Sequence, residues 1–367
     1  MYYIFLIIIL LFAIYEVVTN KRNKLIFDVL FVGLTIMLCL RYGQGQDYFS
    51  YMYIYYNEPF YNYKEVLSTN DIGFYSLSFL CGTILSLDFE WFVAIIGIIS
   101  MSLFYRFFTR ECEYSILSLF GLYCTAFIVY MTSAMRQGLA MSIYVAFALP
   151  YLYEKKWTRY ILIVLLCASF HASALILLIA PLFYSMDSRL LKITIIITSL
   201  VLMFLGATFF DSSTVNAFLA DADHDKIEEN TQWVSKIMRT IYMLPILFIV
   251  YNVKNEQLQR QINLFICILV IYAVFSFMND IATRLWGYAL PFFWIILSLL
   301  KQDKLSFRKN VCHTWYIVLV IMLFFNTLYN DANSYKHGVT MWTFPYFSVF
   351  EKQEVHQHMQ YYNYLGY

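Results

Sequence analysis

Long apolar runs recur along almost the whole chain, and they limit the folds open to it more than any other feature. Several reach the roughly 20 residues that an α-helix needs to cross the hydrocarbon core of a bilayer. They predict an all-α, polytopic integral membrane protein with about 12 transmembrane helices, within a range of about 10–14. The runs fall at about 2–18, 25–40, 91–108, 114–131, 135–153, 157–169, 171–186, 190–209, 236–253, 260–278, 282–300 and 312–328, with a shorter one at about 73–87.

The composition agrees with this class and excludes others. Hydrophobic residues make up 61% of the 367 residues and charged residues only 13%, whereas about a quarter of a soluble domain is charged. The net charge of +1 provides no basic field, so we expect no nucleic-acid partner. Basic residues follow the first run, Tyr3–Val18, without a small-residue cleavage pattern, so this run is expected to stay as the first helix.

Orientation follows from short basic loops, which stay in the cytoplasm. All of them lie inside together if 73–87 is re-entrant or interfacial and if 157–186 is a hairpin of two short helices that turns near His171. We therefore expect a re-entrant or interfacial segment near 41–87, a single transmembrane domain over 1–328 and an extracytoplasmic tail over 329–367. The basic residues used are Lys21, Arg22, Lys24, Arg106, Arg110, Lys155, Lys156, Arg159, Arg189, Lys192, Lys254, Arg260, Lys301, Lys304, Arg308 and Lys309.

The polar segment that begins at Arg41 is the first candidate site. Two glycines between Arg41 and Asp47 allow the chain to turn sharply at the expected outer end of the second helix. Tyr48 and Tyr51 follow at helical spacing within a run of aromatic residues. One interpretation is a snorkelling arginine above an interfacial aromatic belt. The other is a binding site in which the rings stack on sugars.

Arg136 opens an apolar helix and is followed by Gln137. An arginine within the membrane is costly and usually faces a cavity or a partner. Its planar guanidinium suits a bidentate grip on phosphate, although an arginine that anchors the helix at the interface would give the same pattern.

Two further motifs lie between apolar runs. His171, with Ser173 beside it, has the chemistry to bind phosphate, move a proton or cap a helix, and a structural histidine is the alternative. Asp280 and Arg284 are four residues apart and share a helical face. They fit either a surface ion pair or another arginine directed at an anionic substrate.

Metal binding has little support in the sequence. The acidic run Asp221–Glu229 resembles the start of a calcium loop but lacks the glycine at its sixth position, and Gln232 stands where the closing glutamate belongs. His356 and His358 in the tail are a similarly weak pair. The seven cysteines show no metal spacing and mostly lie in apolar runs. We expect no metal and no cofactor.

Taken together, these motifs resemble the EpsG family of bacterial polysaccharide polymerases, relatives of the Wzy O-antigen polymerases. The resemblance covers about residues 1–300 and rests on the order and spacing of the pieces. One departure is Asn70-Asp71, which stands where the family often has Glu-Pro before the glycine. The matching residues are Arg41, Gly43, Gly45, Asp47, Tyr48 and Tyr51, then Gly73, Phe74 and Tyr75, then Arg136, Gln137 and Ala140, then Phe170, His171, Ser173 and Ala174, and finally Arg284 and Tyr288.

The resemblance implies an integral-membrane glycosyltransferase with a GT-C-like helical fold in the bacterial cytoplasmic membrane. Such enzymes work at the outer face without a metal. They take a growing glycan from undecaprenyl diphosphate and join it to the next lipid-linked repeat unit of a capsule, O-antigen or exopolysaccharide. The partners implied are the undecaprenyl-diphosphate-linked oligosaccharide, the lipid bilayer, a flippase that delivers the unit and a chain-length regulator.

This chemistry gives each candidate residue an expected role. Arg41, Arg136 and Arg284 would stabilise the charge that grows on the leaving diphosphate, because preorganised cations can replace a metal in a water-poor site. His171 would be a further diphosphate ligand. Asp47 is our first choice, and His171 the second, for the base that takes the acceptor proton. The substrate-binding set that we predict is Arg41, Tyr48, Tyr51, Gln137, Ser173, Asp280 and Arg284.

Three alternatives stay open at this point. A lipid-linked oligosaccharide flippase would bind the same anionic lipid, but the internal repeats on which many transporters are built are not evident. An O-antigen ligase shares the chemistry of a polymerase, and the sequence separates the two poorly. A membrane O-acyltransferase would use His171, although several arginines fit a diphosphate better than a thioester.

Overall fold

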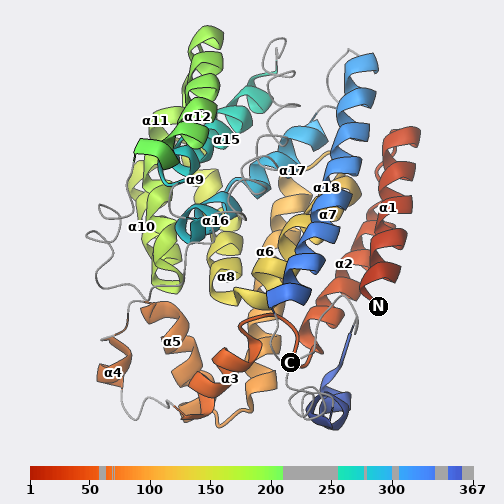
Figure 1. Ribbon diagram of the computed structural model, residues 1–367, viewed down its shortest axis with the longest axis vertical. Coiled ribbons are helices and arrows are strands. Elements are labelled where there is room, and N and C mark those ends of the chain that lie inside the picture. Colours follow the sequence, from red (N-terminus) through yellow and green to blue (C-terminus); the bar gives the residue numbers. More distant parts are fainter. Residues whose placement is uncertain are drawn as a thin grey trace. The chain divides into compact units, whose positions relative to one another are not determined.

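The computed structural model describes residues 1–57, 63–67, 69, 71–209, 255–276, 279–299, 306–334 and 346–357. Its regular elements within these ranges are all helices (Figure 1). The chain divides into two compact units. Unit 1 comprises Met1–Leu175 and Val320–Tyr367, and unit 2 comprises Ile176–Leu319, so the boundary passes through the long helix α18 (Ser306–Ser334).

Unit 1 contains a bundle of apolar helices with several short helices at one end. The bundle elements are α1 (Tyr2–Thr19), α2 (Lys24–Cys39), α6 (Phe89–Glu111), α7 (Ser115–Leu122), the π-helix η2 (Tyr123–Ser133), α8 (Met135–Ile143), the π-helix η3 (Tyr144–Ala148), α9 (Leu149–Tyr153) and α10 (Trp157–Phe170). The short elements are α3 (Tyr48–Asn57), α4 (Tyr63–Leu67), α5 (Ile72–Phe79), the π-helix η1 (Leu80–Ile84) and η6 (Val349–Glu351). Figure 1 shows α3, α4 and α5 together at the lower end.

The core of unit 1 is built around α7 and η2. In an 18-residue window of the apolar stretch Ser115–Ser133, 94% of the residues are buried, against 28% in such a window of α1. On α1 the side chains of Ile4, Leu11 and Val18 are 60%, 61% and 77% exposed. A face of this kind is unfavourable in water, and lipid is the surrounding that suits it.

Glu16 joins α1 to α7 inside this core. Its side chain is fully buried, and Oε2 accepts hydrogen bonds from the amides of Ile116 and Leu117 at 2.9 and 3.0 Å. The first amides of a helix lack partners within the helix, and its N-terminus attracts negative charge. The carboxylate of one helix therefore caps the start of another.

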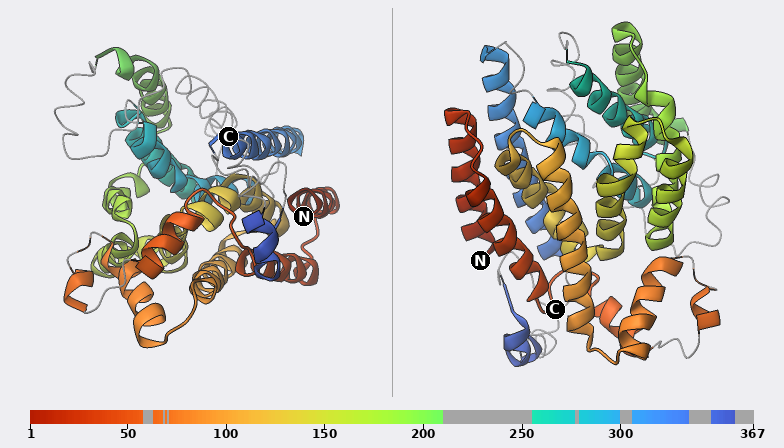
Figure 2. Two further views of the ribbon diagram at one scale, coloured as in Figure 1. Left: turned by 60° about the horizontal axis from the view of Figure 1, so that its bottom comes forward. Right: turned by 180° about the vertical axis from the view of Figure 1, so that it is seen from behind.

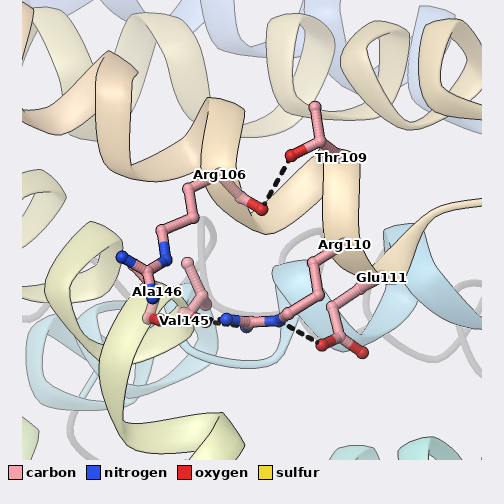
Figure 3. Close-up of polar contacts among 6 residues, drawn as sticks. All are labelled: Arg106, Thr109, Arg110, Glu111, Val145 and Ala146. Carbon is pink, nitrogen blue, oxygen red and sulfur yellow. Dashed lines mark hydrogen bonds and ion pairs between the residues drawn. The ribbon is translucent and has the colours of Figure 1, made fainter.

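Arg110 plays a similar part at the far end of α6, as Figure 3 shows. Its Nη2 and Nη1 donate to the carbonyls of Val145 and Ala146 at 2.9 and 3.1 Å, and its Nε pairs with Glu111 at 2.6 Å. Nearby, the Tyr114 hydroxyl donates to Asn20 Oδ1 at 2.5 Å. Segments beside different basic loops thus meet at one end of unit 1.

Unit 2 is organised around α15. Its elements are α11 (Ala180–Tyr184), α12 (Arg189–Phe209), α15 (Glu256–Val274), α16 (Asn279–Gly287), α17 (Leu290–Leu299) and the first part of α18, while η4 (Ala172–Ile179) crosses the boundary between the units. Helix α15 packs against α11, α12, α16 and α17. The Asn263 amide on α15 donates to the carbonyls of Tyr184 and Met186 at 3.2 and 2.9 Å, which fixes the end of α11.

The structure supports an all-helical membrane protein. Six helices in the described part are long and apolar enough to span a bilayer, and four further apolar helices are shorter. One of these, Ile72–Ile84, falls in the segment predicted to be re-entrant or interfacial. Near His171, α10 ends at Phe170 and η4 begins at Ala172. The predicted hairpin of two short helices over 157–186 stays a prediction.

The structure does not test several other predictions about the fold. The figure of about 12 spans and the GT-C-like architecture stay predictions, as does the division into 1–328 and 329–367. The run at about 236–253 and the acidic loop at about 210–235 lie outside the described residues.

Candidate functional site

Arg136 is placed by an abrupt change of helix type. The π-helix η2 ends at Ser133, and Ala134 leaves the helical region (φ −81°, ψ 60°) before α8 begins at Met135. The turn is tight, because a side chain on Gly138 would collide with the carbonyl of Tyr130. The missing side chain of Gly138 therefore lets α8 start close against η2. Arg136 projects from the first turn of α8, next to a π-helix of the kind often found at functional sites.

The guanidinium of Arg136 is held by two residues that are distant in the sequence. Nη1 pairs with Asp71 Oδ2 at 2.7 Å, and Nε donates to the Tyr51 hydroxyl at 3.2 Å. The group also lies over the rings of Tyr51 and Phe74, at 5.3 and 5.8 Å from their centres. The side chain of Arg136 is 30% exposed. The guanidinium is therefore fixed in position and still accessible to a ligand.

These neighbours determine the charge of Arg136. A guanidinium stays protonated in proteins, and the ion pair with Asp71 favours its charged form. Burial raises the pKa of Tyr51, Arg136 lowers it in part, and the charge of Asp47 raises it. The site therefore contains a permanent cation beside a neutral phenol.

Asp71 is the member of this cluster that sequence reasoning missed. It precedes α5 and is 8% exposed. Its Oδ1 accepts the Ala172 amide at 3.3 Å while Oδ2 pairs with Arg136. One signal could have found it: a Glu-Pro pair directly before Gly73 occupies positions 71 and 72, one residue later than the alignment with Asn70-Asp71, so that Asp71 stands at the glutamate.

Gly73 brings α5 against the end of α10. A Cβ added at Gly73 would lie 2.5 Å from Ser169 Oγ and 3.2 Å from the ring of Phe170. The next residue, His171, has an extended backbone (φ −157°, ψ 114°), and its two ring nitrogens are shielded from solvent. Ser173 lies just beyond, in η4. The structure thus places the His171 backbone one residue from the Asp71 contact.

The loop from Arg41 to Asp47 reaches the same region from the other side. Gly43 and Gly45 have positive φ values of 68° and 101°, and a Cβ on Gly45 would lie 2.5 Å from the carbonyl oxygen of Thr132. The Gln46 amide donates to Ser133 Oγ at 3.1 Å. Both glycines are therefore required, and the loop lies against the end of η2.

Arg41 points into the protein. It is 2% exposed, and it donates to the carbonyls of Leu38 and Thr132 at 2.7 and 3.3 Å. Its Nε has no hydrogen-bond partner among the described residues. Tyr48 is fully buried, with its ring edge-on to Phe89. The phenol of Tyr51 reaches Arg136 instead.

The described structure therefore brings some predicted residues together and not others. Asp47, Tyr51, Arg136 and the His171 segment meet at one end of unit 1, with Gln137 buried beside Arg136. Asp280 and Arg284 belong to α16 in unit 2, where Arg284 is exposed and the side chain of Asp280 lies outside the described residues.

Within the described ranges, no three His, Cys, Asp or Glu side chains lie close enough together to hold a metal ion. The run Asp221–Glu229 and His358 fall outside those ranges. His356 falls inside them, where its Nε2 lies 3.0 Å from the Tyr42 hydroxyl.

Comparison with known proteins adds one finding. The model of the EpsG family matches residues 24–348, which include all of the segments that form this cluster. No curated protein and no solved structure gives a match.

Proposed function

Because the chain belongs to the EpsG family of Wzy-like polysaccharide polymerases, we propose that it polymerises undecaprenyl-diphosphate-linked oligosaccharide repeat units into a surface polysaccharide. The reaction is an inverting, metal-independent glycosyl transfer at the outer face of the bacterial cytoplasmic membrane. A flippase supplies the lipid-linked unit, and a chain-length regulator acts on the product.

The observation that carries the proposal is the cluster of Arg136, Asp71 and Tyr51 at one end of an apolar helical bundle. When the glycosidic bond breaks, negative charge grows on the bridging oxygen of the diphosphate. A cation already fixed in place stabilises this charge without reorganising during the reaction. Arg136 fits this role because its exposed part faces outward while Asp71 and Tyr51 hold the rest.

The proposed transfer balances without a metal. A hydroxyl of the acceptor sugar attacks the anomeric carbon, the bond from that carbon to the diphosphate breaks, and the diphosphate leaves with the electron pair. The acceptor proton passes to a carboxylate, and Asp47 is the candidate because it is partly exposed and close to Tyr51. General base catalysis of this kind contributes roughly 10²–10⁴-fold. Attack opposite the leaving group inverts the anomeric carbon.

The remaining predicted residues complete the proposal. Arg41 acts from beneath the loop as a buried cation, and its Nε has no hydrogen-bond partner among the described residues. His171 is the second candidate base and a further diphosphate ligand, with Gln137 and Ser173 beside the same groups. Tyr48 and Tyr51 support sugar binding. Asp280 and Arg284 are proposed to bind another part of the lipid-linked substrate.

Replacing Arg136 tests the function directly. We expect Arg136→Ala to lower polymer formation by about 10²–10³-fold, the usual cost of losing one transition-state donor, while the protein still accumulates in the membrane. Arg159→Ala is the matched control, because it removes an exposed guanidinium that lies over the Tyr151 ring. Normal-length polymer in the Arg136→Ala strain would contradict the proposal.

The glycan of a deletion strain separates the polymerase from its rivals. A missing polymerase leaves single repeat units displayed outside the membrane. Single units retained inside would indicate a flippase. Finished polymer that stays on its lipid carrier would indicate a ligase.

A further inference from the structure

A short C-terminal segment is paired with the loop that begins at Arg41. We call residues 346–357 the C-terminal strap. The Tyr42 amide donates to the carbonyl of Phe347 at 2.9 Å, and the Val349 amide donates to that of Leu40 at 2.8 Å. Arg41 and Ser348 form an antiparallel bridge between these two bonds. Both views in Figure 2 show the strap beside the end of α2.

Side chains reinforce this pairing at its start. The Tyr346 hydroxyl donates to the carbonyl of Met37 at 3.0 Å. Ser348 and Glu351 form a capping box, in which Glu351 Oε2 accepts from both the amide and the hydroxyl of Ser348 at 2.8 Å. The strap therefore turns into a helix immediately after the bridge.

The helical half of the strap is attached to the same region. Lys352 Nζ pairs with Glu90 Oε1 at 2.5 Å, at the start of α6. Val355 is fully buried, and its side chain lies where a Cβ on Gly43 would approach within 3.1 Å. The Tyr42 hydroxyl contacts His356 Nε2 at 3.0 Å. The strap and the loop that begins at Arg41 therefore form an interface with both polar and apolar contacts.

The loop needs external support of this kind. It contains two glycines at positive φ, and glycine loses more conformational freedom on folding than any other residue. The strap hydrogen-bonds to the backbone on both sides of Arg41. Its contacts restrict the start of the loop, at Tyr42 and Gly43, while η2 holds Gly45 and Gln46 next to Asp47.

We propose that the strap is a positioning element for the reaction: it holds the start of the loop that leads to Asp47, whose carbonyl accepts the amide of Tyr51 at 2.9 Å. This inference rests on the proposed function, because it assumes that Asp47 acts on the acceptor. Small displacements of a reacting group lower turnover strongly and alter substrate binding little. The EpsG family match ends at residue 348, so the helical half of the strap lies beyond it.

The substitution Val349→Pro removes one strap bond, and the ring carbon on its nitrogen pushes the strap away from the carbonyl of Leu40. Proline has no amide hydrogen, so the bond to Leu40 is lost. Val349 is the first residue of η6, a position where proline is favoured, and Ser348 before it is extended (φ −97°, ψ 167°), as a residue preceding proline must be. Phe350→Ala is the matched control, because Phe350 is 83% exposed.

Two measurements are made on each full-length variant. Hydrogen exchange reports on the loop whether or not the protein is an enzyme, and we expect the Tyr42 amide of Val349→Pro to exchange about fivefold faster. Polymer formation by the purified protein should fall about tenfold in turnover, with the half-saturating concentration of lipid-linked substrate changed less than about twofold. Phe350→Ala should match the wild-type protein in both.

Each other outcome overturns the inference. Unchanged exchange would show that the strap does not hold the loop. Faster exchange with unchanged turnover would show that the loop does not need holding, and faster turnover would make the strap an inhibitory lid. Lys352→Ala, which breaks the pair with Glu90, must act in the same direction as Val349→Pro. The proposed function is judged separately, by Arg136→Ala.

Discussion

Arg136 combines two properties that rarely occur together at the end of an apolar bundle. Its orientation is fixed by Asp71 and Tyr51, and its side chain is still 30% exposed. An ion pair with that much exposure contributes little to folding stability, typically about 0–1 kcal/mol. The ion pair instead fixes geometry. Because Asp71 also accepts the Ala172 amide, it holds Arg136 close to the segment that contains His171.

The substitution Asp71→Asn separates the two effects of that carboxylate. Neutralising it removes an anion that competes for Arg136, so binding of the lipid diphosphate should tighten about fivefold. Turnover should fall about tenfold, because the guanidinium loses its strongest fixed partner. Binding of lipid-linked substrate and rate of polymer formation are measured on the same purified protein.

A matched variant controls for charge alone. Asp71→Glu keeps the carboxylate and should restore part of the turnover. If Asp71→Asn left turnover unchanged, Asp71 would have no positioning role, and looser binding would contradict the competition.

Sequence reasoning found most of the residues at this site but not their pairing. Arg136 was identifiable because an arginine at the start of an apolar helix is costly, and the glycines were identifiable because the loop must turn. The partner of Arg136 was not, since Asp71 lies 65 positions away along the chain. Nor does any local pattern show that Arg41 is buried, because its partners are backbone carbonyls.

At the scale of elements, the π-helix η2 decides where Arg136 emerges. Its wider turn ends with the Ala134 amide bonded to the carbonyl of Val129 at 2.8 Å. Hydropathy predicts the apolar helices before and after this point, but it carries no information on the switch from α to π. Gly138 is the residue in the sequence that permits this change from π-helix to α-helix, because its lack of a side chain lets α8 approach the carbonyl of Tyr130.

The substitution Gly138→Ala should therefore damage the site out of proportion to its size. The new methyl group meets a backbone carbonyl, so η2 and α8 must separate, at a cost of about 1–3 kcal/mol for overpacking. Gly33→Ala is the matched control in another helix, where the methyl would meet only the ring of Phe5 at 3.3 Å. We expect a lower thermal midpoint in detergent and lost polymer formation for Gly138→Ala alone.

The test compares the thermal midpoints and the polymer formation of Gly138→Ala and Gly33→Ala. Equal midpoints would show that η2 yields without strain. A lower midpoint with full activity would show that the position of Arg136 tolerates the shift.

At the scale of the molecule, unit 1 has two chemically different ends. Helix α6 connects them: it begins next to the Glu90–Lys352 pair and ends with Arg110 bonded to Ala146. Its 23 residues span about 34 Å, close to the thickness of the hydrocarbon core. The charge pattern of short loops predicts that the end with Arg110 faces the cytoplasm, because insertion into the membrane reads local positive charge rather than tertiary structure.

The pairing of the strap could not be predicted from the sequence. The pairing of the strap with Leu40 and Tyr42 joins residues more than 300 positions apart. The sequence of the tail has no periodic pattern of hydrophobic residues that would predict this pairing. The figure of about 12 spanning helices stays a prediction, because several apolar runs form helices of 10–17 residues in the described part of the chain.

Single cysteines at the two ends test the arrangement of the whole molecule. Gln46 and Lys156 are both exposed, and they lie at the site end and the basic end respectively. With native cysteines that are buried or half-buried, Gln46→Cys should react with a membrane-impermeant thiol reagent in intact cells, and Lys156→Cys only after the membrane is opened. The physical reason is that basic loops stay on the cytoplasmic side. Labelling of position 156 but not 46 in intact cells would place Arg136 in the cytoplasm, where no polymer is assembled under the proposed function.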